Sequence, residues 1–340
     1  MPPNRQPGHA TLVDVAAAAN VARSTASRAL QGSPRISVGT TRRVRAAADR
    51  LGYQPNRIAR SLRKRSGDLV GIVVPDIGAD FYSHVVKGAQ NIFDKAGFQV
   101  LVLNTEREAA REQLAIQMLT EHRVAGVMLA TSGHPELDIR IPVVFFDNVV
   151  PGAGAANVAR ANHDGMRLLV SHLVEHGHSR IAYVGGPATL TSGIERLEGY
   201  YRGLASHGLR ERANYAQIAD AGWSSATGGE AMRRLLHLRQ PPTAVVTSSD
   251  TLALGALKAA RDEGARVPCD VALVSFDDPP FGELLDPPVT ALRRNDREMG
   301  ELAASLLLHA LENGATGPPT EVRLPAELLV RASCGCEQIP

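Results

Sequence analysis

A short stretch near the start of the chain carries side chains that suit contact with nucleic acid. Its arginine, serine and threonine residues are Arg23, Ser24, Thr25, Ser27 and Arg28. Arginine and hydroxyl side chains donate hydrogen bonds to phosphate oxygens and to the edges of bases. If these residues share the outer face of a helix, that face suits DNA. An alanine-rich helical hairpin with a solvated basic face is the structural alternative.

Two short helices joined by a tight turn are predicted to position this face. The apolar residues of the first helix recur at i, i+3, i+4 and i+7, at Leu12, Val15, Ala16 and Ala19. Asn20 follows them and tolerates the left-handed backbone conformation that ends a helix. The second helix resumes an apolar face at Ala26, Ala29 and Leu30. The predicted order is therefore helix, turn, helix.

A third helix is predicted between Ser37, a suitable N-cap, and Gly52. Beyond it, Pro55 disfavours helix in the residue before it, which leaves about two turns of possible helix from Asn56 to Arg63. So short a helix is marginal alone in water. We expect it to form only against a partner helix or in a DNA groove.

The distribution of charge separates this head from the rest of the chain. Residues 1–65 contain 13 Lys and Arg residues against two acidic residues, a net charge of +11, whereas residues 66–340 carry −9. A compact basic segment joined to an acidic body is typical of a nucleic-acid-binding module attached to a domain of another kind. The charge therefore favours DNA binding over the simple hairpin.

The remainder of the chain alternates short apolar runs with helical patterns, which predicts parallel sheets wound by crossover helices. The runs are LVGIVV, FQVLVL, VAGVML, PVVFF, RIAYVGG, TAVVTS and VALVSF. They fall into groups of four and three, separated by a Pro-, Gly- and Ala-rich stretch around residues 148–162. We predict two doubly wound lobes that face each other across a cleft. Such sheets bind ligands beyond the carboxyl ends of their strands.

Three segments, TLVDVAAAANVARSTASRAL, TTRRVRAAADRLGYQPNRIARSL and VGIVVPDIGADFY, resemble the lactose/galactose repressor (LacI/GalR) family of bacterial transcription regulators. The resemblance extends from residue 11 to about residue 330. It implies an all-α helix-turn-helix head and an α/β body of two periplasmic-binding-protein-like lobes with parallel sheets. It also implies a sequence-specific DNA-binding regulator, a repressor by default, whose operator affinity is controlled by a small effector.

This resemblance gives the residues of the head and the hinge their roles. Arg23 and Ser24 begin the recognition helix in the major groove, and Arg28 lies one turn further along. The residues implied to hold the DNA backbone are Thr25, Ser27 and Asn56. Ala59 and Leu62 match the hinge residues with which paired subunits open the minor groove, and Leu62 is the wedge that unstacks a base step.

The same resemblance implies an effector site in the cleft of the body. The implied contact residues are Phe81, Tyr82, Asp147, Arg196, Trp223, Ser249 and Asp277. An aromatic plane together with Arg and Asp side chains suits a polar ring, so a sugar or a sugar derivative is expected. The structural alternatives are core positions for Phe81 and Tyr82, and an ion pair between the lobes for Arg196 and Asp277.

Departures from the family pattern limit what the resemblance implies. Ala22 replaces a common serine cap, Ser249 replaces a common asparagine, and Asn148 replaces a common arginine. Arg23 stands where the family varies most, so the operator sequence cannot be copied from a relative. Leu190 replaces an arginine of the purine-responsive branch, which counts against a purine co-repressor.

Other residue groups favour neither a metal nor a cofactor. His172, His176 and His178 lie near a predicted helix end, where histidines more often interact with the helix dipole than with a metal ion. Cys334 and Cys336 are too close together for a zinc pair of the usual spacing, and the GGP segment lacks a Walker or dinucleotide fingerprint. We therefore expect no metal and no cofactor.

Two other function classes share features with this sequence. A solute-binding protein has a two-lobed body, but it needs a secretory signal and no basic head, and an enzyme needs a catalytic constellation that we do not find. The sequence shows no signal peptide and no apolar run long enough to span a membrane, and three cysteines fit a reducing compartment. We predict a cytoplasmic, nucleoid-associated bacterial regulator that is not an enzyme.

The predicted parts of the chain are a DNA-binding head, a hinge and a two-lobed body, at residues 1–55, 56–66 and 67–340. Each predicted lobe combines two segments, about 67–160 with 291–320 and about 161–290 with 321–335. Two heads that each read half of a palindromic operator require two chains. The C-terminal tail lacks heptads, which predicts a homodimer without a tetramerising coil. The residues leave open whether the effector releases the DNA or secures it.

Overall fold

The computed structural model of the chain describes residues 12–30, 36–51, 68–133, 139–209, 215–218, 222–313 and 320–335. The chain divides into two compact units, Met1–Gly67 and Asp68–Pro340. Each unit contains hydrophobic core residues of its own. The predicted hinge residues Asn56, Ala59 and Leu62 lie outside the described residues.

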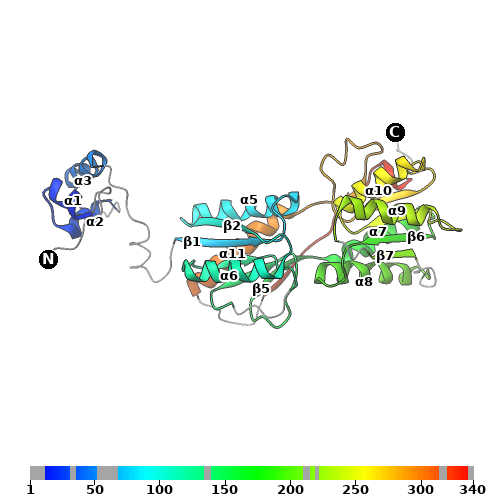
Figure 1. Cartoon of the computed structure of the whole chain (residues 1–340), viewed down its shortest axis with the longest axis horizontal. Coiled ribbons are helices and arrows are strands. Elements are labelled where there is room, and N and C mark those ends of the chain that lie inside the picture. The colour runs from blue at the N-terminus through cyan, green and yellow to red at the C-terminus, as the bar shows by residue number, and fades with distance from the viewer. Residues whose placement is uncertain are drawn as a thin grey trace. The chain divides into compact units, whose positions relative to one another are not determined.

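The described part of the first unit is a bundle of three helices, α1 (Leu12–Ala18), α2 (Arg23–Leu30) and α3 (Val38–Arg50) (Figure 1). Its core residues are small: Val15, Ala16, Ala19, Ala26, Ala29, Val44, Ala47 and Ala48. Asn20 has a φ of 50°, as predicted for the turn after the first helix. The Ser37 hydroxyl accepts a hydrogen bond from the Thr40 backbone N–H at 3.3 Å and so caps α3. The predicted helix-turn-helix is confirmed.

The second unit contains two six-stranded sheets, each flanked by helices (Figure 1). The first sheet has the strand order β11-β5-β4-β3-β1-β2 and is parallel throughout. Its strands are β1 (Leu69–Val74), β2 (Gln99–Asn104), β3 (Val127–Leu129), β4 (Val143–Phe146), β5 (Ala156–Arg160) and β11 (Glu321–Leu324). Its helices are α5 (Asp80–Lys95), α6 (Ala109–Glu121) and α11 (Asp296–Asn313).

The second sheet has the order β12-β10-β9-β8-β6-β7, and only the short edge strand β12 is antiparallel to its neighbour in the described residues. Its strands are β6 (Ile181–Gly185), β7 (Ala216–Ile218), β8 (Ala244–Thr247), β9 (Ala272–Ser275), β10 (Thr290–Leu292) and β12 (Leu328–Leu329). Its helices are α7 (Asn162–Glu175), α8 (Thr191–Ser206), α9 (Ser225–Leu236) and α10 (Asp250–Asp262), and a 3₁₀ turn covers Ala332–Cys334. The predicted fold class of two doubly wound lobes is confirmed.

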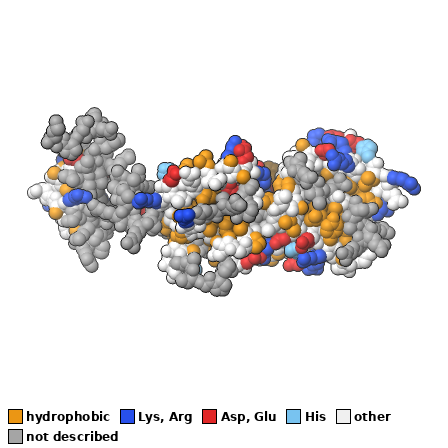
Figure 2. Space-filling view, turned by 60° about the horizontal axis from the view of Figure 1, so that its bottom comes forward, with side chains coloured by type: hydrophobic (Ala, Val, Ile, Leu, Met, Phe, Trp, Pro, Cys, Tyr) orange, Lys and Arg blue, Asp and Glu red, His pale blue; other side chains and the backbone are white. Residues whose placement is uncertain are grey.

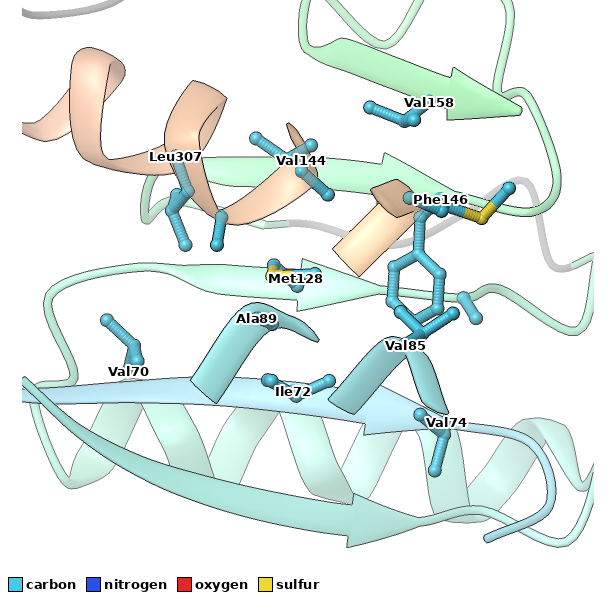
Figure 3. Close-up of a cluster of buried hydrophobic side chains, with 14 of the residues drawn as sticks. Val70, Ile72, Val74, Val85, Ala89, Met128, Val144, Phe146, Val158 and Leu307 are labelled. Atoms are coloured by element: carbon cyan, nitrogen blue, oxygen red, sulfur yellow. The ribbon is translucent and has the colours of Figure 1, made fainter. Parts of the chain in front are cut away.

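One face of the first sheet packs against α5 and α11 (Figure 3). Val70, Ile72 and Val74 of β1 meet Val85 and Ala89 of α5 in this core. Residues of α6 cover the other face and are part of a second core cluster. A strand buried on both faces needs apolar residues at successive positions, which is why β1 reads LVGIVV rather than an alternating pattern.

Two of the predicted boundaries between the lobes are wrong. Thr290–Leu292 pairs with β9 of the second sheet, so the chain returns to the first lobe only at residues 293–295. Glu321–Leu324 pairs with β5 of the first sheet, and the chain enters the second lobe for the last time at residues 325–327. The stretch 148–162, interpreted above as a separator, contains strand β5. These strands have five residues or fewer, too few to give a strong periodic signal.

Candidate functional site

A cleft of about 400 Å³ lies between the two lobes of the second unit. It is lined by all seven residues predicted to contact an effector: Phe81, Tyr82, Asp147, Arg196, Trp223, Ser249 and Asp277. Three of them lie at the ends of strands: Asp147 follows β4 directly, and Ser249 and Asp277 lie two residues beyond the ends of β8 and β9. The carboxyl ends of parallel strands therefore position the cleft, as expected for doubly wound sheets.

Phe81 and Tyr82 begin helix α5 and contact each other edge to face, with ring centroids 4.8 Å apart. Tyr82 is 5% exposed and packs in the first lobe's core, and its hydroxyl donates a hydrogen bond to Asp147 Oδ2 at 3.0 Å. The core position considered for Tyr82 is therefore correct, and the same residue also lines the cleft. Tyr82 thus holds the Asp147 carboxylate from the side of the core.

Asp147 occupies an unusual backbone conformation at the end of β4. Its φ is 68°, in the left-handed region that residues with a Cβ rarely adopt. Burial raises the pKa of its carboxyl above the ordinary value, against the lowering effects of Arg196 and of the Tyr82 hydrogen bond. A part-buried carboxylate held in this way accepts further hydrogen bonds readily from a ligand in the cleft.

Asn148, the residue that departs from the common arginine, joins the two lobes next to Asp147. Its side-chain oxygen accepts hydrogen bonds from the Ser192 backbone N–H at 3.2 Å and from the Ser192 hydroxyl at 2.8 Å. Ser192 belongs to α8 of the second lobe and lines the cleft. A short amide therefore makes an interlobe contact beside the cleft.

Arg196 is fixed by protein partners on several sides. Its Nε donates to Asn162 Oδ1 at 3.0 Å, and its Nη1 donates to the Ser248 carbonyl at 2.6 Å. The guanidinium lies 4.0 Å from the Phe276 ring centroid and 5.7 Å from that of Trp223. A guanidinium stacked and bonded in this way is pre-organised, so little rotamer entropy is lost when it binds a ligand.

Asp277 links the lobes, although through Arg160 and not through Arg196, the partner considered from the sequence. Arg196 approaches it at 3.6 Å, but both residues belong to the second lobe. The interlobe ion pair is with Arg160, at the end of β5, which also pairs with Asp296 at the start of α11. Burial raises the pKa of Asp277, but Arg160 and Arg196 outweigh it, and the pKa lies below the ordinary value. Asp277 is therefore ionised at neutral pH.

Trp223 presents its ring to the cleft because a glycine leaves room for it. A Cβ added at Gly186, in the GGP segment, would lie 2.4 Å from Trp223 Cε2. No side chain larger than hydrogen fits there without moving the indole. The glycines of this segment thus serve packing, in agreement with the absence of a phosphate-binding fingerprint.

Ser249 lines the cleft and also caps a helix. Its hydroxyl accepts a hydrogen bond from the Leu252 N–H at 3.3 Å at the start of α10. The next residue, Asp250, also lines the cleft and pairs with Arg294 at 3.2 Å. Burial raises the pKa of Asp250, and the nearby Asp277 raises it further. The carboxylate of Asp250 adds a second acceptor to this end of the cleft.

Sequence reasoning missed several residues of the cleft, among them Arg160, Arg107 and Asp76. Arg160 ends β5, a five-residue strand whose sequence ANVAR does not alternate strictly between apolar and polar residues and so gives little periodic signal. Arg107 follows Glu106, and both have positive φ values, of 61° and 51°. Two successive left-handed residues turn Arg107 into the cleft, where Asp76 lies 3.9 Å away. Glycine and asparagine are the residues that usually indicate such a turn, and neither is present here, so the sequence does not predict it.

The residues predicted to bind DNA are described only in part. Arg23 is exposed and Thr25 is half-buried on α2, the second helix of the helix-turn-helix. The side chains of Ser24, Ser27 and Arg28 lie outside the described part of the structure, although their backbone belongs to α2. The exposure of Arg23 is compatible with the predicted DNA-binding face.

In the described ranges, no cluster of three or more His, Cys, Asp or Glu residues is arranged to hold a metal ion. Among the described helices, none is both long enough and apolar enough to cross a membrane. Cys269 is exposed and Cys334 is buried.

Family models match both units of the chain. Residues 11–56 match "Bacterial regulatory proteins, lacI family", and residues 170–334 match "Periplasmic binding protein-like domain". The repressor CytR of Escherichia coli K12 is 31% identical over 340 residues, which cover 98% of each chain. The regulator CelR of Thermobifida fusca is 34% identical over 336 residues, covering 95% of this chain and 98% of the relative.

Solved structures agree with these matches. The lac repressor dimer bound to operator and the anti-inducer ONPF has a TM-score of 0.86 and 27% identity, covering 96% of this chain and 99% of that one. A complex of CelR with cellobiose has a TM-score of 0.72 and 32% identity, covering 96% and 100%. The chain belongs to the lacI family of bacterial regulatory proteins and is a DNA-binding transcriptional regulator of the repressor type.

Proposed function

We propose that this regulator binds a sugar or a sugar derivative in the interlobe cleft and that this binding controls its affinity for a palindromic operator. The observation that carries the proposal is the convergence of seven predicted contact residues on one cleft. A ligand that contacts both lobes binds one arrangement of the lobes better than another. It therefore shifts the population of that arrangement.

The chemistry of the cleft supports a sugar. Trp223 offers an apolar ring face, which suits the C–H face of a pyranose or a furanose. Arg196 supplies donors, and the carboxylates of Asp147, Asp250 and Asp277 supply acceptors. Vicinal hydroxyl groups both donate and accept, so they match such a mixed set better than a purely anionic or apolar ligand does.

The names of the relatives support the same class of ligand. The CelR structure is a complex with cellobiose, and two relatives at 31% and 32% identity are ribose operon repressors. Leu190, in the position of the purine-branch arginine, lines the cleft with an apolar side chain. This side chain offers a nucleobase no hydrogen bond.

The DNA-binding proposal assigns Arg23, Ser24 and Arg28 to the bases. The residues proposed to hold the DNA backbone or to open the minor groove are Thr25, Ser27, Asn56, Ala59 and Leu62. All of them belong to the segment that matches the lacI family model or to the residues that follow it. The proposed role is regulatory binding rather than catalysis, in the cytoplasm of a bacterium, where the operator lies.

The proposed assembly is a homodimer, because two heads are needed to read the two halves of a palindrome. The second lobe carries two apolar side chains in the loop after β9, Phe281 and Leu284, each 75% exposed. Large exposed apolar side chains that lie together mark association surfaces. A second copy of the chain is the proposed partner, as in the lac repressor dimer.

The test uses Trp223, the only tryptophan in the chain. We expect one member of a panel of glucose, galactose, ribose, cellobiose, glucuronate and cytidine to change its fluorescence saturably. Asp147→Asn keeps the shape and the Tyr82 contact but removes the charge, so affinity should fall about 10- to 100-fold. Asp270→Asn, in an exposed pair with Arg266, is the matched control and should bind as the wild type does.

Three results would contradict this proposal. The first is a nucleoside as the only ligand of the panel. The second is calorimetric binding of a sugar without any change in Trp223 emission. The third is an Asp147→Asn variant that binds the sugar as tightly as the wild type.

A further inference from the structure

A part-buried ion pair that is not itself part of the cleft lining joins the two lobes. Arg323 of β11 donates from Nη1 to Glu195 Oε2 at 2.6 Å and from Nη2 to Glu195 Oε1 at 2.7 Å. Arg323 belongs to the first lobe and Glu195 to α8 of the second. A bidentate pair with two charge-assisted hydrogen bonds fixes both distance and direction. It therefore favours one relative placement of the lobes.

Asn162 connects this pair to the cleft. It is the first residue of α7, directly after the chain crosses between the lobes, and it is 2% exposed. Its Nδ2 donates to Glu195 Oε2 at 2.8 Å, and its Oδ1 accepts from Arg196 Nε at 3.0 Å. One amide therefore bonds both to the ion pair and to an arginine of the cleft.

The other cleft charge is connected to the same ion pair. Arg323 Nη1 also donates to the Arg160 carbonyl at 3.1 Å, and the Arg160 guanidinium pairs with Asp277. Arg196 and Asp277 lie 3.6 Å apart, which closes a ring of polar contacts. Ala161 lies between Arg160 and Asn162, two members of this ring, and its N–H donates to the Leu324 carbonyl at 2.9 Å. The chain crosses between the lobes three times. The first crossing, between β5 and α7, and the third, at residues 325–327, thus meet at this ring.

We propose that Glu195 and Arg323 form an interlobe latch, and that Asn162 is a positioning residue that makes the latch sensitive to a ligand held by Arg196. The proposal rests on the proposed effector role of the cleft. A ligand that bonds to the Arg196 guanidinium changes the strength of its hydrogen bond to Asn162 Oδ1, and this changes how well Asn162 Nδ2 supports Glu195. Ligand and latch then bias the same two arrangements of the lobes, which is the physical requirement for coupling.

Three substitutions separate the parts of the latch. Glu195→Gln and Arg323→Gln remove its charge from opposite lobes, so one remains usable if the other fails to fold. Asn162→Asp keeps the acceptor for Arg196 and removes the donor to Glu195. Asp270→Asn again removes an exposed bidentate pair, that with Arg266, which lies within the second lobe and far from any crossing in sequence.

The first experiment needs no ligand. Hydrogen exchange of the full-length protein is followed at two backbone amides that join neighbouring crossing segments. The Ala161 N–H donates to the Leu324 carbonyl, and the Arg293 N–H donates to the Glu327 carbonyl. We expect faster exchange at both amides in Glu195→Gln and Arg323→Gln, and wild-type exchange in Asp270→Asn. Wild-type exchange in both latch variants would overturn the latch, whatever the cleft binds.

The second experiment uses the sugar that changes Trp223 emission and an operator selected from random duplexes by the wild type. The coupling is the ratio of operator Kd values with and without saturating sugar. We expect this coupling ratio to fall about 2- to 30-fold in Glu195→Gln and Asn162→Asp. The half-saturating sugar concentration of Asn162→Asp should stay within about threefold of the wild-type value. Unchanged coupling in both variants would overturn the role of Asn162. If no sugar in the panel binds, the proposed function fails, and the exchange experiment alone decides the latch.

Discussion

Asp147 shows how one residue of the cleft depends on several others. Its left-handed backbone costs free energy, on the order of 1–3 kcal/mol, and such conformations persist where the surroundings impose them. Tyr82 and Asn148 both contact its Oδ2 through hydrogen bonds. The carboxylate is thus aimed into the cleft by its backbone and held there by two side chains. We interpret this arrangement as preparation for a ligand.

Arg28 provides a test of base recognition by a single side chain. Arg28→Ala should weaken binding to the selected operator by about 1–3 kcal/mol, because a bidentate contact with a base edge is lost. Binding to random-sequence DNA should weaken much less, since phosphate contacts carry that affinity. Gel-shift titrations on both duplexes at one salt concentration measure the difference. Equal losses on the two duplexes would assign Arg28 to a phosphate instead.

Glycines determine how closely the helices of the second lobe approach one another. A Cβ added at Gly255 of α10 would lie 1.8 Å from the Ser225 carbonyl oxygen of α9. Gly255→Ala must therefore separate the two helices and should lower the free energy of unfolding by about 1–3 kcal/mol. Urea denaturation measures this loss.

Gly39 of α3 is the control for this substitution. No atom lies within 4 Å of a Cβ added there. Gly39→Ala should therefore stabilise its own unit by about 0.5–1 kcal/mol, because alanine loses less backbone entropy in a helix. A Gly255→Ala variant as stable as the wild type would show that α9 and α10 adjust to the added methyl group without cost.

Elements with a strong local pattern were predictable, and short strands were not. The turn at Asn20 and the cap at Ser37 follow from single side chains that favour one backbone conformation. The buried strands β1 and β8 follow from uninterrupted apolar runs. In contrast, β11 is a half-buried edge strand with the sequence EVRL, and its place is decided by pairing with β5. Arg160 was missed for a similar reason, because it ends β5, a five-residue strand with little periodic signal of its own.

Among the described residues of the second unit, many charged side chains form ion pairs with a neighbouring residue. On the face drawn in Figure 2, acidic and basic side chains lie close together, with hydrophobic side chains between them. Among the described residues, several exposed ion pairs lie within one helix, such as Lys258 with Asp262 and Arg234 with Glu230. Exposed pairs contribute little to stability because water screens them. The part-buried pair of Glu195 and Arg323 differs from them in burial and in joining the lobes.

The latch should be sensitive to acid. Burial raises the pKa of Glu195, but hydrogen bonds from Arg323 and Asn162, with the nearby charges of Arg323 and His163, hold it below the ordinary value of 4.5. The stabilisation by the carboxylate is therefore complete above about pH 4.5 and is lost as the pH falls through the lowered pKa. Unfolding free energies of the wild type and Glu195→Gln should differ at pH 7 and converge once the pH falls below the lowered pKa of Glu195. A constant difference would mean that the carboxylate charge does not stabilise the fold.

The order of the strands also sets the order in which the parts of this protein are completed during synthesis. The first sheet begins at Leu69, yet its edge strand β11 ends at Leu324, and α11, which covers it, precedes β11 by only a few residues. Nearly all of the second lobe leaves the ribosome before the first lobe is finished. The helices of the head, complete at Arg50, are synthesised long before the cleft exists. A nascent or prematurely ended chain can therefore carry its DNA-reading helices without a finished sensor.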